Sequence, residues 1–298
     1  MYSIDEITHA VKNPSAVQHE LLRHTLFRPR PEGVNLLNED WDTLIILDAC
    51  RYDIFKDSIG RMDLTGELSS KPSLGSATKE WVRNTFKERE EHDLVYVTAN
   101  GWLKSLREDI NSSLYDSYWL TGEEYRNSAG TVDPEDVTDV AIEAHNENPN
   151  KRLIIHYVQP HAPYIQSGRE YFEEMPGLTV NEFVQLPEVT NDLLRRAYRE
   201  TLDSVLEEVR RLLNTIDGKS VISADHGEML GERKPPFWMR EYGHPLGVYY
   251  DELVTVPWFE VTHEQRRTII SEEPKETRSA DDEELMEHLD ALGYGDHT

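Results

Sequence analysis

The stretch WDTLIILDACRYD, residues 41–53, predicts a buried β-strand that ends in a carboxylate. Residues 43–47 form a short, largely apolar run, which is typical of a strand covered on both faces of a sheet. Asp48 follows at the carboxyl end of that strand. Open α/β sheets bind their ligands beyond the carboxyl ends of the strands, so Asp48 is a candidate site residue.

Four further stretches have the form of buried strands. They are DLVYVTANGW (residues 93–102), KRLIIHYVQPHAPY (151–164), KSVISADHGE (219–228) and, as the weakest, LVTVPWFEV (253–261). Three of these apolar runs end in polar residues of interest, namely Asn100, His161 and the pair Asp225–His226. Together with Asp48, these residues predict a polar rim along one edge of a sheet.

The segment before KSVISADHGE predicts a long amphipathic helix. Apolar residues recur at steps of three or four from Leu194 to Ile216, and Asp217–Gly218 is a helix stop signal. We expect this helix to be scaffold without a catalytic role. Buried strands that alternate with helices predict an α/β fold whose mostly parallel sheet is covered on both faces.

The composition is strongly acidic. The 298 residues include 31 Lys plus Arg and 57 Asp plus Glu, which gives a net charge of −26, and the mean hydropathy is −0.65. This charge repels nucleic acids and anionic membrane surfaces, so the sequence predicts neither as a partner. An acidic surface that is poor in lysine suits molar salt, and we favour a halophilic adaptation over an acidic binding role.

Cysteine content and hydropathy bear on the location. Cys50 is the only cysteine, so no intramolecular disulfide is expected. No stretch approaches the roughly 20 apolar residues of a membrane-spanning helix, and residues 1–13 lack the basic and apolar pattern of a signal peptide. The sequence therefore predicts a cytoplasmic, soluble protein of undetermined oligomeric state.

The pair Asp225–His226 has two interpretations. Asp225 is the N-cap of a following helix, or the two residues are metal ligands. We favour the metal, because other strands place polar residues at the same rim. Carboxylates combined with an imidazole form a nitrogen and oxygen ligand set, which suits Zn²⁺ or Mn²⁺ better than Ca²⁺; Ca²⁺ remains the alternative.

A candidate nucleophile lies in KPSLGSATKEWVRNTF, residues 71–86. Its second half predicts a helix with Thr78 or Ser76 at the N-cap. A hydroxyl there lies near backbone N–H groups and the positive end of the helix dipole, which stabilise an alkoxide or a bound oxyanion. The simpler interpretation is an ordinary cap, and local sequence alone leaves both open.

The motifs LIILDACRYD, SLGSATKEW, VQPHAPY, SADHGE and YGHPLGVYYDELVTVP occur in an order that resembles the sulfatase-like branch of the alkaline phosphatase superfamily. The sequence looks most like haloarchaeal sulfatase-like proteins, and the resemblance covers residues 41–261. It implies an alkaline-phosphatase-like three-layer α/β sandwich. We expect a helical extension over 1–38, a sulfatase-like catalytic domain over 39–262 and an acidic C-terminal segment over 263–298, which carries one short peripheral helix with loose flanks.

The resemblance also implies roles for individual positions. Three positions match metal ligands, two match the nucleophile, two match contacts to the substrate or a second metal, and two are expected near the anionic group of the ester. The metal ligands match Asp48, Asp225 and His226, and the nucleophile matches Thr78, which we prefer, or Ser76. The contacts to the substrate or a second metal match His161 and His244. The residues expected near the anionic group of the ester are Arg51 and Asn100.

The sequence departs from the family at two places. It lacks the C-x-P-S-R type motif that sulfatases convert to formylglycine, so we expect Cys50 to be a buried apolar residue and favour a phosphoester over a sulfate ester. Two-metal relatives carry an aspartate four residues before the histidine that His161 matches, where this chain has Tyr157. We therefore expect one firmly held metal and a structural role for His156.

These observations predict a metal-dependent hydrolase or transferase of phosphate or sulfate esters with a Ser/Thr nucleophile, including phosphodiesterase activity. The expected substrate is an anionic ester, either a small molecule or linked to a glycan or lipid. The alternatives are a sulfatase acting on a sulfated glycan and a catalytically silent sulfatase-like binding protein.

Overall fold

A seven-stranded sheet forms the centre of the protein in a computed structural model that describes residues 14–24, 32–275 and 282–292. The strand order is β2-β9-β6-β1-β5-β3-β4, and a separate hairpin consists of β7 and β8. The strand bounds are β1 Thr43–Asp48, β2 Gly66–Pro72, β3 Glu90–Thr98, β4 Ser113–Trp119, β5 Arg152–Pro160, β6 Ser220–Ser223, β7 Met229–Lys234, β8 Met239–Gly243 and β9 Thr255–Val261.

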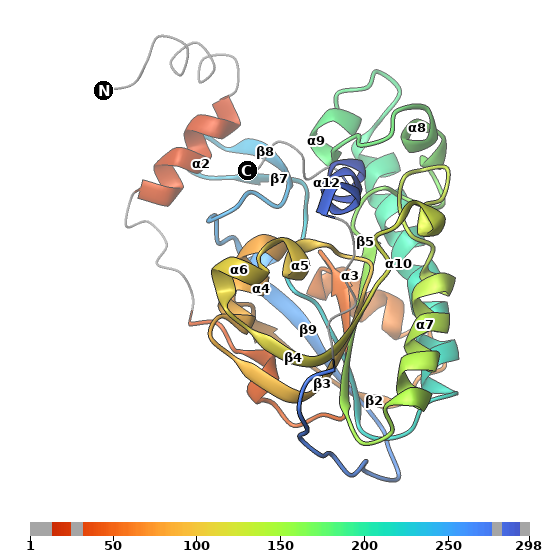
Figure 1. The fold of residues 1–298 in the computed structure, drawn as a ribbon. Helices are drawn as coiled ribbons and strands as arrows, with labels where there is room; N and C mark the ends of the chain where they lie inside the picture. Colours follow the sequence, from red (N-terminus) through yellow and green to blue (C-terminus); the bar gives the residue numbers. More distant parts are fainter. Residues whose placement is uncertain (1–13, 25–31, 276–281, 293–298) are drawn as a thin grey trace.

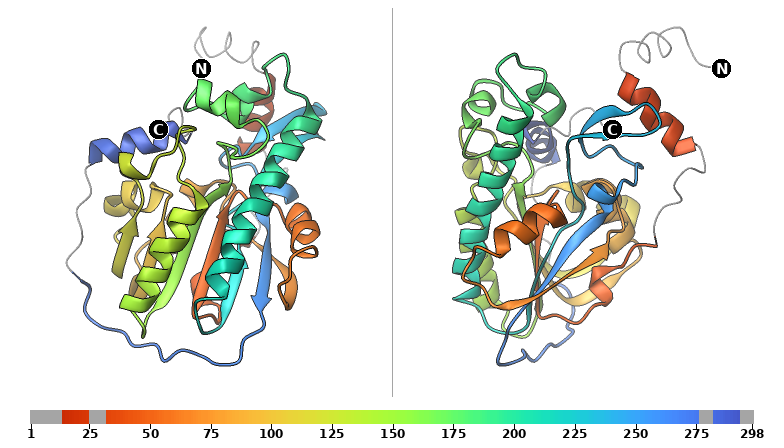
Figure 2. Two further views of the ribbon diagram at one scale, coloured as in Figure 1. Left: turned by 90° about the vertical axis from the view of Figure 1, so that its right-hand side faces the viewer. Right: turned by 180° about the vertical axis from the view of Figure 1, so that it is seen from behind.

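Helices cover both faces of the sheet (Figure 1). In Figures 1 and 2, α3, α7 and α10 lie against one face, and α4 and α5 lie on the other. The helix bounds are α2 Pro14–His24, α3 Tyr52–Ile59, α4 Thr78–Phe86, α5 Trp102–Ser105, α6 Arg107–Ile110, α7 Pro134–Glu147, α8 Arg169–Glu174, α9 Val180–Phe183, α10 Asn191–Leu213, α11 Asp251–Val254 and α12 Asp282–Ala291, with 3-10 turns at Leu36–Asn38 and Glu123–Tyr125.

The sheet is mostly parallel, as the sequence predicts. Strand β1 pairs in parallel with β5 and β6, and β3 pairs in parallel with β5 and β4. Strand β9 runs antiparallel to β6 and to β2. The carboxyl ends of β1, β3, β5 and β6 therefore lie at the same edge of the sheet.

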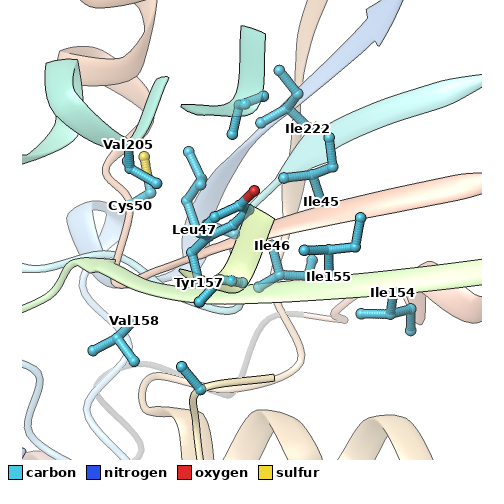
Figure 3. Close-up of a cluster of buried hydrophobic side chains, with 14 of the residues drawn as sticks. Ile45, Ile46, Leu47, Cys50, Ile154, Ile155, Tyr157, Val158, Val205 and Ile222 are labelled. Carbon is cyan, nitrogen blue, oxygen red and sulfur yellow. The ribbon is translucent and has the colours of Figure 1, made fainter. Parts of the chain in front are cut away.

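The core forms around the central strands. Ile45 and Leu47 of β1, Ile155 of β5 and Ile222 of β6 are fully buried, and Val205 of α10 packs among them (Figure 3). Successive side chains of a strand point to opposite faces, so a strand covered on both faces needs apolar residues at nearly every position. This requirement explains why the central strands read as continuous apolar runs.

All five predicted strands are present, and four others were missed. The missed strands are β2, β4, β7 and β8. β2 and β4 are the two edges of the sheet, and most residues of β2 are exposed or half-buried. An edge strand with the sequence GELSSKP lacks the apolar run that identifies a central strand.

The predicted long helix is α10, with its apolar stripe buried from Leu194 to Leu212. It ends at Leu213, four residues before the predicted stop at Asp217–Gly218. Asn214 is the C-cap. Gly218 instead forms a turn with φ of 89°, which leads into β6.

Residues 263–275 contradict the expectation of loose flanks around a C-terminal helix. They form an extended strap along the amino-terminal edge of the sheet (Figure 2). Arg266 donates to both carboxylate oxygens of Asp42 at 2.9 Å, Lys151 donates to the Ile270 carbonyl at 2.7 Å, and Lys275 donates to Asp116 at 2.9 Å. Specific ion pairs order this polar segment, and hydropathy patterns carry no information about them.

The predicted extension over 1–38 includes α2, while residues 1–13 and 25–31, with most of the expected connector, lie outside the described residues. Among the described helices, none has the length and apolar character to cross a bilayer.

The contact between Arg266 and Asp42 gives a stability prediction. The side chain of Asp42 is fully buried and that of Arg266 is 43% exposed, so Arg266→Gln should lower the free energy of unfolding by about 1–2 kcal/mol. Arg210→Gln, which removes an exposed pair with Glu207, is the matched control and should cost less than about 0.5 kcal/mol. Urea denaturation of both variants measures the difference.

The same pair predicts a pH dependence. Burial opposes ionisation of Asp42, but hydrogen bonds from Arg266 and from the Lys219 and Arg267 amides outweigh it and lower the pKa of this carboxyl. Its stabilisation is therefore present above the carboxyl pKa of the unfolded chain and is lost as the pH falls through the lower folded-state pKa. The difference between wild type and Arg266→Gln should shrink below about pH 4, and a constant difference would contradict this assignment.

Candidate functional site

The predicted polar residues meet at the carboxyl edge of the sheet. Asp48 is the last residue of β1, Asn100 lies two residues after β3, and His161 directly follows β5. Asp225 and His226 follow β6. No helix begins at Asp225, because a loop leads directly into β7, so the N-cap interpretation is wrong.

Asp48, Asp225 and His226 form a fully buried cluster, here called the acidic cluster. One ligand atom from each residue lies within 4.8 Å of the others, a spacing that could hold a metal ion. The Nε2 atom of His226 is 3.6 Å from Asp48 Oδ1 and 3.3 Å from Asp225 Oδ2.

Hydrogen bonds orient the ligand atoms of this cluster. Nδ1 of His226 lies 2.8 Å from the Gly227 carbonyl oxygen, which fixes the proton on Nδ1 and turns the Nε2 lone pair towards the carboxylates. Asp225 Oδ1 accepts the amide protons of Ala49 and His226 at 3.1 and 2.8 Å. Asp225 Oδ2 is buried and has no hydrogen-bond partner among the described residues.

The electrostatics of the cluster fit a cation. Burial raises the pKa of Asp225, although the nearby His156 imidazole and several hydrogen bonds act against this rise. Burial also lowers the pKa of His226 well below its ordinary value, so its imidazole is neutral at neutral pH. No lysine or arginine in the described part of the chain pairs with Asp225. A divalent ion would supply the missing positive charge.

Thr78 lies against the acidic cluster. It is the first residue of α4, and the N-cap is Ala77, not Thr78 or Ser76 as the sequence predicts. Its Oγ1 is 3.0 Å from His226 Nε2 and 3.3 Å from Asp48 Oδ1. The start of α4 therefore points a hydroxyl at the ligand atoms.

Ser76 does not share this position. Its Oγ donates towards the Pro245 carbonyl at 3.2 Å and accepts the Gly247 amide at 2.9 Å. These bonds tie the loop at 245–247 to the start of α4. The Ser76 hydroxyl is therefore directed at another loop and not at the acidic cluster. The choice between Thr78 and Ser76 as nucleophile stays a prediction, in which this geometry favours Thr78.

A second group could also hold a metal ion. It consists of His161, Glu228 and His244, and it is called the histidine cluster below. His244 Nδ1 is 3.3 Å from Glu228 Oε1, while Glu228 Oε2 is buried without a partner among the described residues. The His244 ring centroid is 4.9 Å from that of His161 and 4.6 Å from that of His226, so the two clusters adjoin.

The pKa values of the two histidines in this cluster are shifted in opposite directions. Burial, reinforced by His244 and His226, lowers the pKa of His161 well below its ordinary value. Burial alone would also lower the pKa of His244, but the Glu228 carboxylate outweighs it and raises that pKa. His244 therefore favours its protonated form, whereas the neutral imidazole of His161 has a lone pair on one ring nitrogen.

Asn100 and Arg51 hold other parts of the site in place. Asn100 Nδ2 donates to Asp48 Oδ2 at 2.7 Å, which orients that carboxylate. The Arg51 guanidinium is 5% exposed and donates to Asp53, to Glu232 and to the Glu228 carbonyl. Both side chains are engaged with the protein, so the structure supports orienting roles rather than the substrate contacts expected from the sequence.

Sequence reasoning missed three contributors. His156 was expected to be structural, but its Nε2 lies 3.9 Å from both Asp48 Oδ2 and Asp225 Oδ2, and burial lowers its pKa to about 4. Glu228 was also missed, although its place two residues after His226 in the sequence could have indicated a role at the site. Tyr198 of α10 donates its hydroxyl to the Ala49 carbonyl at 2.7 Å, so the scaffold helix supports the turn after β1.

Two other positions agree with the sequence analysis. Cys50 is fully buried in the core, as expected, and burial raises the pKa of its thiol well above its ordinary value (Figure 3). Tyr157 pairs in register with Leu47 and so points to the face of the sheet opposite to Asp48. Its hydroxyl there is 2.8 Å from that of Thr138 of α7. The expectation of one firmly held metal stays a prediction, because His161, Glu228 and His244 form a second group that could hold an ion.

No family model matches the sequence, and no curated protein matches it either. Solved structures do match. The integral membrane protein lipooligosaccharide phosphoethanolamine transferase A (EptA) from Neisseria meningitidis is 16% identical, with a TM-score of 0.50, over 78% of this chain and 49% of that chain. The chain thus spans about half the length of that transferase.

Two other solved structures have TM-scores of 0.47. The C-terminal periplasmic domain of phosphoethanolamine transferase EptC from Campylobacter jejuni is 18% identical over 73% of this chain and 77% of that chain. A putative sulfatase from Bacteroides thetaiotaomicron is 12% identical over 76% of this chain and 65% of that chain.

The match to the transferase concerns the fold. It agrees with the mostly parallel sheet and with the motifs quoted from the sequence, which predict the same architecture. The chain has an alkaline-phosphatase-like α/β fold, which it shares with that transferase.

Proposed function

We propose that the protein is a metal-dependent hydrolase or transferase of phosphate or sulfate esters, with Thr78 as its nucleophile and a preference for phosphoesters. One observation carries this proposal. The Thr78 hydroxyl oxygen, at the first turn of α4, lies 3.0 Å from His226 Nε2 and 3.3 Å from Asp48 Oδ1. A nucleophile and a set of metal ligands thus meet at one point in a buried site.

Asp48, Asp225 and His226 would hold the metal, for which we favour Zn²⁺ or Mn²⁺ over Ca²⁺. A divalent ion bound there supplies Lewis-acid polarisation of an ester oxygen and lowers the pKa of a nearby hydroxyl. Asn100 keeps the Asp48 carboxylate in position. The Gly227 carbonyl keeps the His226 lone pair directed at the site.

Thr78 would attack the phosphorus of the ester. The Thr78 hydroxyl proton passes to Asp48, whose Oδ1 accepts from it at 3.3 Å. The bond from Thr78 Oγ1 to phosphorus forms as the bond from phosphorus to the leaving oxygen breaks, and the leaving oxygen takes a proton. His244 is placed to give that proton, because Glu228 favours its protonated form. Attack by water would then restore Thr78 and give hydrolysis, and attack by an alcohol would give group transfer.

The remaining side chains of the site bind rather than react. His161 is buried with a neutral imidazole whose Nδ1 contacts the Ala162 carbonyl, so its Nε2 lone pair would accept a hydrogen bond from the substrate. The backbone N–H groups at the start of α4 favour negative charge on Thr78 and on the transferred group. Cys50 is buried in the core, which supports an unmodified hydroxyl nucleophile and hence a phosphoester.

The substrate class follows from these groups. We propose an anionic ester, either small or linked to a glycan or lipid, and a phosphodiester is included. The solved structures of similar fold include phosphoethanolamine transferases and sulfatases, so transfer and hydrolysis are both retained. Halophilic adaptation and a cytoplasmic location remain predictions from the sequence.

Replacement of the nucleophile tests the proposed reaction. Thr78→Val removes the hydroxyl at nearly constant shape and should lower kcat on an aryl phosphate or a bis-aryl phosphodiester at least about 10³-fold. Ser76→Ala is the matched control, since its hydroxyl serves the loop at 245–247, and should lose less than about tenfold. Steady-state assays in high salt with Zn²⁺, Mn²⁺ or Ca²⁺ measure both.

Other outcomes would redirect the assignment. Activity retained in Thr78→Val and lost in Ser76→Ala would reverse the two roles. Turnover of an aryl sulfate alone would favour the sulfatase alternative, and turnover of no ester with any metal would favour a silent binding protein. Denaturing mass spectrometry of trapped enzyme should find the phosphoryl group on the peptide that contains Thr78.

Metal binding has a readout that does not need activity. At a metal concentration of about 100 Kd, binding should stabilise the wild type by about 2.7 kcal/mol and raise its Tm by several degrees. Asp225→Asn should lose this increase. In chelator it should unfold at the wild-type temperature or above, because burial disfavours the Asp225 charge.

Asp139→Asn is the matched control for this experiment, because Asp139 is exposed and pairs with Arg211 outside the site. Its metal-dependent rise in Tm should equal that of the wild type. A rise that persists in Asp225→Asn would show that the metal binds elsewhere.

A further inference from the structure

The hairpin of β7 and β8 projects beyond the central sheet beside α2 (Figure 1, Figure 2). Its turn carries Phe237 and Trp238, which are 52% and 64% exposed. These are the two most exposed large hydrophobic residues in the described part of the chain. Two adjacent aromatic side chains in water indicate a binding surface more strongly than scattered apolar residues do.

The protein holds this turn in place. Trp238 has a φ of 54°, a left-handed conformation that bulky residues rarely adopt. Its carbonyl accepts a hydrogen bond from Arg233 at 2.8 Å, and the Phe237 amide donates to Gln18 of α2 at 3.0 Å. The exposed aromatic pair is therefore fixed by specific bonds, and such local strain clusters at functional positions.

The charge of the turn is opposite to that of the whole chain. Residues 233–240, RKPPFWMR, carry three basic residues and no acidic one, in a chain with a net charge of −26. Arg233 and Arg240 donate to the backbone carbonyls of Trp238 and Gly231. In the described residues neither arginine pairs with a carboxylate. Lys234 pairs with Glu252.

The two acidic residues that flank the turn face the protein. Glu232 accepts from Arg51 at 2.5 Å and from Arg195 at 2.6 Å. Glu241 is 1% exposed and contacts His19 of α2 at 2.6 Å. The hairpin thus hides its carboxylates and presents two arginines around two aromatic rings.

We propose that this turn, residues 233–240, docks on the surface of a lipid bilayer that contains anionic lipids. Tryptophan and phenylalanine partition to the interface between headgroups and acyl chains, and arginine side chains bind anionic headgroups. An acidic protein surface could pair with the two arginines, but it would offer the aromatic rings no apolar environment such as the acyl chains of a bilayer provide. The net charge of the chain opposes association with a second copy, and it opposes an anionic bilayer everywhere except at this basic turn, which projects beyond the sheet. Docking through the turn alone would therefore differ from the repulsion by anionic membranes that the overall composition predicts.

The docking surface and the candidate site share one hairpin. Strand β7 begins one residue after Glu228, and β8 ends one residue before His244. The six residues of β7 span about 20 Å, so Glu228 lies at most about that far from the docking turn. Docking itself does not depend on the proposed reaction, so its test stands whether or not the protein turns over an ester.

The experiment is sedimentation of the full chain with vesicles of phosphatidylcholine, alone or with about 30% phosphatidylglycerol. We expect binding to the anionic vesicles, at least about tenfold weaker in the double variant Phe237→Ser, Trp238→Ser. Arg233→Gln and Arg240→Gln should each weaken it about fivefold. Salt should weaken the wild type more than the variant that lacks both arginines.

Ile270→Ser and Arg210→Gln are the matched controls, because they change an exposed apolar and an exposed basic residue outside the hairpin. Both should bind like the wild type, and thermal unfolding should show that every variant is folded. Absence of vesicle binding by the wild type would overturn the proposal, as would equal binding by the hairpin variants. A dimer in sedimentation velocity that the aromatic variant abolishes, without vesicle binding, would assign the turn to a second copy instead.

Discussion

The burial of two carboxylates at neighbouring strand ends is the constraint on which the site depends. Asp48 and Asp225 are both inaccessible to solvent, and the imidazoles of His226 and His156 beside them are neutral at neutral pH. Buried negative charge without positive compensation is costly, so this arrangement calls for a cation. The protein supports the arrangement with backbone amides on Asp225, with Asn100 on Asp48, and with the first turn of α4.

The sequence predicted the parts of the fold that burial alone determines. Central strands need apolar side chains on both faces, so β1, β5 and β6 were evident as apolar runs. Edge strand β2 is polar and exposed, and nothing in its residues distinguishes it from a loop. The strap over 263–275 was also missed, since it is ordered by Arg266 and other charged residues whose partners lie far away in the sequence.

At the site, too, the sequence predicted some residues and could not place others. Strand ends that converge on one edge predicted Asp48, Asn100, His161 and the pair Asp225–His226 as neighbours, because this follows from parallel topology. The place of Thr78 beside them was implied by the family resemblance. His156 could not be placed without the register, in which it pairs with Ile46 and so shares a face with Asp48. The direction of the Ser76 hydroxyl towards the loop at 245–247 could not be predicted, because a shift of two residues at a helix start changes where a side chain points.

The central claim is that the acidic cluster binds a divalent cation against Thr78. Anomalous X-ray scattering from crystals grown with Mn²⁺ or Zn²⁺ tests it most directly. We predict an anomalous peak about 2.0–2.2 Å from carboxylate oxygens of Asp48 and Asp225 and from Nε2 of His226. A peak at another position in the same crystals, with none in this cluster, would contradict the account.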